Sequence, residues 1–136
     1  MATPSAQAQK ELFVNEAHAL ADALLHPVVK GIVTAPPVEA SDGEAFIIAD
    51  NATEAFAGRT GQIALRQQEQ WLFVTPAAGM RVFDSILGAE RHYRDGWSTP
   101  VSLSTPGSGD TIDVEARAVI DQILNLMQGA GLLPSG

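Results

Sequence analysis

The chain has 136 residues, the size of one domain with a single hydrophobic core. Sixteen acidic residues against eight basic ones give a net charge of −8, which argues against binding to nucleic acid because Lys and Arg carry the affinity for phosphate. The absence of cysteine excludes disulfides and a cysteine nucleophile, and the lack of a secretory signal or of an apolar run of roughly 18 residues predicts cytoplasmic synthesis and no membrane span.

The first predicted element is an amphipathic helix over residues 5–26. Thr3 and Pro4 suit its start, as the N-cap and the first helical residue. The segment 6–11, AQAQKE, has no large apolar group, so it either projects into solvent or rests on a partner chain through its alanines. The helix ends at His26, which precedes a proline. The apolar residues follow helical spacing: Leu12, Phe13, Ala17, Leu20, Ala21, Leu24 and Val28.

Residues 28–100 are predicted to form an antiparallel β core, a small meander or barrel-like sheet. Short strands over 28–33 and 44–49 come first. Residues 61–84 then indicate three consecutive strands of one antiparallel sheet, because short apolar runs alternate there with turn residues. These strands are 61–66, 70–75 and 80–84, and the first two form a hairpin. A later hairpin is expected between residues 90–93 and a strand that begins at Trp97, since Asp-Gly lies between them.

Residues 101–110 have the composition of a Gly/Ser linker, and a second amphipathic helix is expected over 111–130. Thr111 or Asp113 suits its N-cap. Polar residues are expected opposite a broad apolar stripe, at Arg117, Asp121, Asn125 and Gln128. The stripe either packs on the open face of the sheet or joins neighbouring subunits. As a candidate oligomer or partner interface it comprises Val119, Ile120, Ile123, Leu124 and Met127. The fold predicted for residues 1–136 is thus a single α+β domain.

No catalytic, cofactor or metal motif appears in the sequence. Carboxylate pairs such as Asp42 with Glu44 lie in turns, where capping explains them. The histidines lack the spacing of metal ligands: His18, His26 and His92. We therefore expect a protein that is not an enzyme and that holds no metal or cofactor.

Trp71, Tyr93 and Trp97 are candidates for a sugar-binding platform, since hairpins can place their rings on one sheet face. A carbohydrate-binding module that recognises cell-surface polysaccharide is therefore the alternative function. The competing interpretation is that these rings fill the core of a small sheet, because aromatic side chains supply the most buried area per residue.

Over about residues 6–133 the chain resembles the small head-spike and tail-fibre-type virion proteins of alphaproteobacterial, Rhodobacterales-like prophages and gene transfer agents. Their shared domain has no assigned enzymatic activity. The resemblance is carried by the opening AQAQKELFVNEAHALADALL, the blocks APPVEASDGEAFIIAD, FAGRTGQIAL and WLFVTPAAGMRVFD, and the closing VEARAVIDQILNLMQGAGLL.

The resemblance implies a capsid-associated structural component of a phage-like particle, made in the bacterial cytoplasm and located in the virion. It would be a homo-oligomeric head-spike base or fibre adaptor that binds capsid and fibre proteins and helps the particle attach to its host. Contact with cell-surface polysaccharide would be indirect. A trimer suits a fibre and a pentamer suits a capsid vertex. No catalytic residue is implied.

Overall fold

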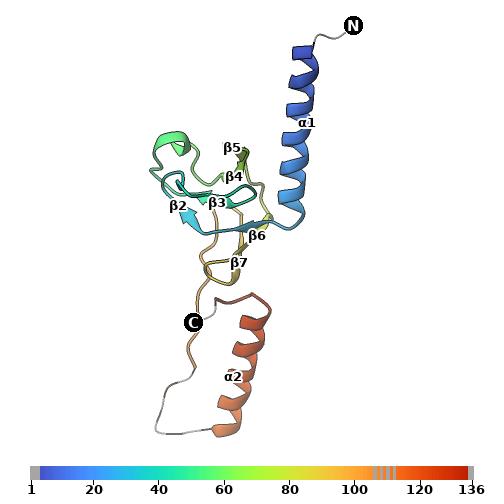
Figure 1. Ribbon diagram of the computed structural model, residues 1–136. Coiled ribbons are helices and arrows are strands. Elements are labelled where there is room, and N and C mark those ends of the chain that lie inside the picture. Colours follow the sequence, from blue (N-terminus) through green and yellow to red (C-terminus); the bar gives the residue numbers. More distant parts are fainter. Residues whose placement is uncertain (1–3, 106, 108, 110, 112, 135–136) are drawn as a thin grey trace.

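The computed structural model describes residues 4–105, 107, 109, 111 and 113–134. In this part of the chain a β core lies between two helices that project from its opposite ends (Figure 1). The predicted α+β class and both helices are confirmed, although the predicted cap Thr3 lies outside the described residues. In chain order the elements are α1 (Pro4–Leu25), β1 (Val28–Val29), β2 (Ile32–Val33), β3 (Ala45–Ile48), the short 3₁₀ helix η1 (Glu54–Phe56), β4 (Ile63–Gln67), β5 (Gln70–Val74), β6 (Arg81–Asp84), β7 (Ala89–His92) and α2 (Val114–Gly129).

The described strands form two small sheets. The prediction of a single antiparallel sheet was therefore wrong. One sheet has the order β2-β3-β4-β5 and the other β1-β6-β7. The pairs β3–β4, β4–β5 and β6–β7 have the predicted antiparallel direction, and of these the β4–β5 pair was itself predicted. In contrast, β1 runs parallel to β6 and β2 runs parallel to β3. The stretch 61–84 is therefore divided, with β4 and β5 in one sheet and β6 in the other.

Gly31 explains why the strand predicted at 28–33 is two strands. Its φ of +84° lies in the left-handed region that glycine adopts without steric cost. The chain bends there, so β1 and β2 join different sheets. Residues 75–79 make a second transfer, from β5 to β6, through a segment that contains Pro76 and ends at Gly79 with a φ of +93°. Because the chain changes sheets at these two places, it cannot form one continuous meander.

Lys30, beside the first bend, forms an ion pair with Glu44 at the entrance to β3. The Lys30 ammonium, together with the Ser41 amide, holds the pKa of the Glu44 carboxyl below its ordinary value. A lowered pKa stabilises the fold while the carboxyl is charged. This contribution is therefore present above the ordinary pKa and is lost as the pH falls through the lowered one.

The four-stranded sheet carries apolar residues on both faces, because side chains alternate along each strand. On one face they form a cluster that also joins the two sheets: Val29, Ala45, Ile47, Ile63, Leu65 and Val82. The other face holds the cluster of Ile48, Phe56 and Ala64, against which Trp71 and Phe73 pack. All four residues of β3 are consequently buried. α1 covers only the first face, through Ala19, Leu20 and Ala23 near its end.

The predicted hairpin of β4 and β5 is present, and its turn is strained. Gln67 pairs with Gln70, so the loop has two residues, Gln68 and Glu69, with φ values of +46° and +64°. Two consecutive residues with positive φ define a type I′ turn, for which Asn-Gly is the preferred sequence. Asp42 Oδ1 supports the turn by accepting from the Gln68 N–H at 2.9 Å.

We expect the double substitution Gln68→Asn and Glu69→Gly to raise the free energy of unfolding by about 1 kcal/mol, because it relieves left-handed strain and retains the Gln68 amide donor. Urea unfolding measures the change. Ala77→Gly is the control, since the φ of Ala77 is not positive and glycine there relieves nothing. A double variant no more stable than the natural chain would contradict the assignment of strain to this turn.

The second predicted hairpin is reduced to one bridge. β7 pairs with β6, and beyond it only the Tyr93–Trp97 bridge is formed among the described residues. Ser98 closes the loop, because its N–H donates to the His92 carbonyl and its Oγ accepts from the His92 N–H, both at 2.9 Å. Pro100, which has no N–H, prevents the ladder from continuing.

α2 is a separate arm that returns to the β core at its end. Of the two predicted caps, Asp113 is the one used, and its Oδ1 accepts from the Ala116 N–H at 2.9 Å. The described residues of the predicted linker carry no helix or strand, and its residues 106, 108 and 110 lie outside the described part. After α2, the Gly131 carbonyl accepts from the Glu90 N–H of β7 at 2.9 Å.

Candidate functional site

The apolar stripe of α2 touches the rest of the protein along only one edge. Leu124 is 8% exposed and Met127 is half-buried. The other three predicted interface residues face solvent, with Val119, Ile120 and Ile123 exposed by 53%, 42% and 50%. The sequence left two alternatives for the stripe, and one of them was packing within the same chain. Such packing explains the burial of Leu124 and Met127 alone.

Polar residues occupy the remainder of the contact side of α2. Arg117, Asp121 and Gln128, expected opposite the stripe, are all half-buried, whereas Asn125 is exposed. Arg117 donates to the Gly107 carbonyl, while Asp121 Oδ1 is buried without a hydrogen-bond partner in the part of the chain that the structure describes. Helices of soluble proteins normally turn their apolar side inward. α2 instead leaves most of that side in water.

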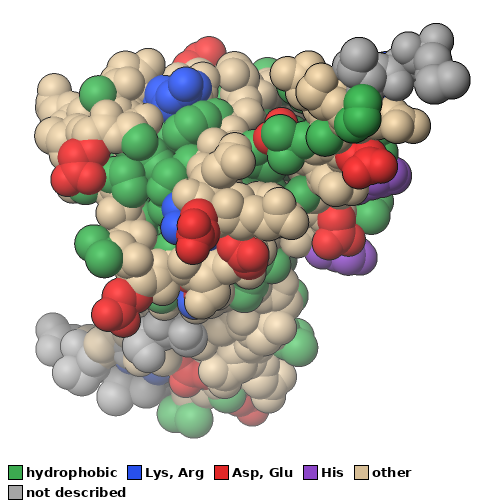
Figure 2. Space-filling model, turned by 45° about the horizontal axis from the view of Figure 1, so that its top comes forward, with side chains coloured by type: hydrophobic (Ala, Val, Ile, Leu, Met, Phe, Trp, Pro, Cys, Tyr) green, Lys and Arg blue, Asp and Glu red, His purple; other side chains and the backbone are tan. Residues whose placement is uncertain are grey.

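α1 also exposes large apolar side chains. No residue from Pro4 to Leu25 is buried, and the first half of the helix extends away from the β core (Figure 1). Figure 2 shows hydrophobic side chains at the surface toward both ends of the molecule. We call the exposed apolar residues of the two helices the helix faces. On α1 the large ones are Leu12, Phe13, Val14, Leu24 and Leu25, and on α2 they are Val114, Val119, Ile120, Ile123 and Leu126.

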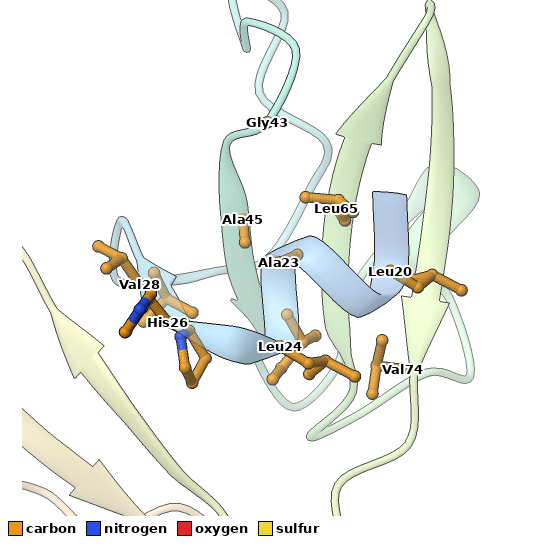
Figure 3. A pocket seen from close by; sticks show the side chains of 12 residues that line it. Leu20, Ala23, Leu24, His26, Val28, Gly43, Ala45, Leu65 and Val74 are labelled. Carbon is orange, nitrogen blue, oxygen red and sulfur yellow. The ribbon is translucent and has the colours of Figure 1, made fainter. Parts of the chain in front are cut away.

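A cavity of about 100 Å³ lies where the end of α1 meets the four-stranded sheet (Figure 3). Its walls are mainly apolar, and His26 is its one titratable lining residue. No carboxylate or hydroxyl lines it beside that histidine, so the described residues offer no acid/base pair there. The cavity is a gap in the packing of α1 and carries no assembled chemistry.

The structure does not bring the three predicted platform residues together. Trp71 lies edge-to-face against Phe46 and Phe56, with ring centroids 6.0 and 5.0 Å apart, in the cluster on one face of the four-stranded sheet. Trp97 packs against the cluster on the opposite face and pairs with Tyr93 at 5.2 Å. The platform of three rings is therefore not formed, because Trp71 alternates with Leu72 onto the other side of β5.

Tyr93 and Trp97 nevertheless line an open groove of about 460 Å³ at the junction of the two sheets. Sequence reasoning missed the rest of its wall, which comes from separate segments of the chain. The other lining residues are Ile32, Ile47, Ile48, Ala49, Asp50, Thr60, Gly61, Asp95 and Gly96. Asp50 follows β3 and Asp95 lies in the turn after β7, so no local motif links them.

The described residues assemble neither a metal site nor a membrane span. No group of three His, Asp or Glu side chains among them is arranged to hold a metal ion. The predicted histidines lie on α1, just after it, and on β7: His18, His26 and His92. Neither helix, over its described length, is long and apolar enough to cross a membrane.

These features define an α+β protein whose distinctive surfaces are two apolar helix faces and an aromatic groove. Residues 14–98 match the family of proteins of unknown function DUF2793, and the chain belongs to that family. The match takes in the second part of α1 and all of β1 to β7, and it ends before α2. No curated protein matches the sequence.

Proposed function

We propose that the protein is a non-enzymatic structural component of a phage-like particle, a gene transfer agent or a prophage particle. In it the chain forms a homo-oligomer that serves as a head-spike base or fibre adaptor between the capsid and the fibre that attaches to the host cell. The resemblance over residues 6–133 to virion proteins supports the assignment to a phage-like particle. The observation that carries the assembly is the orientation of α2. Its exposed apolar residues include Val119, Ile120, Ile123 and Leu126, whereas Arg117, Asp121 and Gln128 are half-buried against the protein.

The outer side of α2 has the chemistry of a contact between copies of the chain. Val119, Ile123 and Leu126 follow one another at helical spacing, and Ile120 adjoins them. Asp121, the last charged residue of the helix, is turned toward the protein, and the exposed Glu115 lies one turn before Val119, so a contact over residues 119–126 places no charged side chain of this side between the copies. Burying each such side chain contributes about 1.5–3 kcal/mol. Copies of α2 around a threefold or fivefold axis would bury this side in a closed ring.

We expect Ile123→Asp to dissociate the oligomer while the monomer keeps its cooperative melt. The aspartate would place an unpaired charge in an apolar contact between copies, at a cost of several kcal/mol. In the isolated chain Ile123 is half exposed, so the same charge disturbs little. Light-scattering mass and thermal melting measure the two effects separately.

Asn125→Asp is the matched control, because it adds the same charge at an exposed polar position of the same helix. It should change neither the mass nor the melt. If Ile123→Asp keeps both its oligomeric mass and its melt, the α2 face is not an interface. If the variant loses its melt in the monomer, the stripe belongs to the core.

Purification of particles from a producing strain tests the particle assignment. Mass spectrometry should find the chain in the particle fraction at a fixed ratio to the capsid protein, and antibody labelling should place it between capsid and fibre. A chain abundant in the cell lysate but absent from intact particles would contradict the assignment.

A further inference from the structure

The groove beside Tyr93 and Trp97 is held in place from both sheets. Gly61 donates its N–H to the Ile48 carbonyl, and its own carbonyl accepts from Trp97 Nε1, both at 2.8 Å. The φ of Gly61 is +77°, and a Cβ there would meet the Tyr93 ring at 4.0 Å. The positive φ suits glycine, and the segment just before β4 is thereby held between the Ile48 carbonyl and the Trp97 side chain.

The backbone of Tyr93 is fixed as firmly. Its N–H donates to the Met80 carbonyl and its carbonyl accepts from the Gly79 N–H, both at 2.8 Å. The Tyr93 and Trp97 rings stand at 64° to each other, so they form two walls of a corner. A site whose walls are fixed before binding loses little conformational entropy when a ligand enters.

The polar side chains that line the groove are carboxylates and hydroxyls. Asp50 and Asp95 are the charged residues among its lining, and Thr60 adds a hydroxyl. Carboxylates accept hydrogen bonds and attract cations, while the faces of aromatic rings pack against C–H surfaces and cations. The lining includes no Lys or Arg to receive a phosphate or a carboxylate. The volume of about 460 Å³ falls within the usual range for small-ligand sites.

We propose that this groove binds one or two units of a saccharide that is neutral or carries an amine. The sugar ring packs its C–H face on Tyr93 or Trp97, and the Asp50 and Asp95 carboxylates accept from its hydroxyl or ammonium groups. An acidic sugar is disfavoured, because both carboxylates and the net charge of −8 repel it. The groove lies outside the helix faces, so this proposal does not depend on assembly.

Titration of the full chain with four probes tests the proposal: cellotetraose, a chitosan tetramer, tetragalacturonate and tetralysine. The Trp71→Phe variant leaves Trp97 as the one tryptophan, so its fluorescence reports on the groove alone. We expect cellotetraose or the chitosan tetramer to shift Trp97 emission. Calorimetry of the natural chain should give the same Kd, since Trp71 lies on the opposite face of the sheet.

Tyr93→Ala should weaken binding by about tenfold through the loss of one ring wall. Asp95→Asn, a change in an exposed turn, tests the groove even if the Tyr93 variant unfolds, and it should weaken the chitosan tetramer more than cellotetraose. The proposal is overturned if no sugar of a broad glycan array or of this set binds, if tetragalacturonate binds best, or if only tetralysine binds. Binding that survives both variants would also overturn it.

Discussion

Phe56→Ala is expected to lower the free energy of unfolding by about 3–5 kcal/mol. Phe56 is 0% exposed, although its 3₁₀ helix η1 lies outside both sheets. Its ring meets Trp71 and Phe73 edge-to-face at 5.0 and 6.0 Å, and it fills the cluster on the second face of the four-stranded sheet. Alanine would leave a cavity that the buried residues of β3 and β4 cannot close, because they are fixed by strand pairing.

Phe13→Ala is the matched control, since the same atoms are removed from a side chain that is 66% exposed. It should change stability by less than about 0.5 kcal/mol. Both variants are best measured by urea unfolding in the Ile123→Asp background, where assembly does not contribute. Equal effects at the two positions would show that η1 does not anchor the second face of the sheet.

Asp84→Ala is expected to cost about 3–5 kcal/mol, because it leaves a buried guanidinium without its partner. Asp84 is fully buried, and its Oδ2 accepts from Arg91 Nε at 2.7 Å. Its Oδ1 accepts from the backbone N–H groups of Ile86 and Leu87 at 3.0 and 3.2 Å, which shapes the turn between β6 and β7. Asp84→Asn can still accept from those amides and should cost less than the alanine variant.

The exposed ion pair on the same two strands is the control. Arg81 and Glu90 approach to 3.4 Å at the surface, where solvent screens their attraction. Glu90→Gln should therefore change stability by no more than about 1 kcal/mol. Thermal melting of the three variants ranks their losses of stability. If Glu90→Gln lowered the stability as much as Asp84→Ala, burial would not explain the importance of the Asp84–Arg91 pair.

Local chemistry explains what could be predicted from the sequence. The helix bounds, the cap at Asp113 and the hairpin around Gln68 all follow from residues close in the chain. The division into two sheets does not, because alternation shows which side chains share a face and says nothing of which strands pair. Gly31 marks the bend only once its neighbours are known to join different sheets. The buried Arg91 was not foreseen, since charged residues are rarely buried.

The candidate sites could be predicted only in part, because their residues also come together through tertiary contacts. Helical spacing located the apolar stripe of α2, but the stripe is wider than the contact, so the pattern could not separate buried Leu124 from exposed Ile123. Strand alternation places Trp71 with Phe73, away from Trp97. The groove joins residues around positions 32, 48, 61 and 95, which only the tertiary fold brings together.

Sedimentation equilibrium of the full chain, over a wide range of concentrations, tests the assembly of the helix faces most directly. Each copy has a mass of 14.3 kDa. The expected result is one closed species of three or five copies that persists on dilution to low micromolar concentrations. A single-copy mass at every concentration would contradict the account, because the exposed side of α2 would then have no partner among copies of this chain.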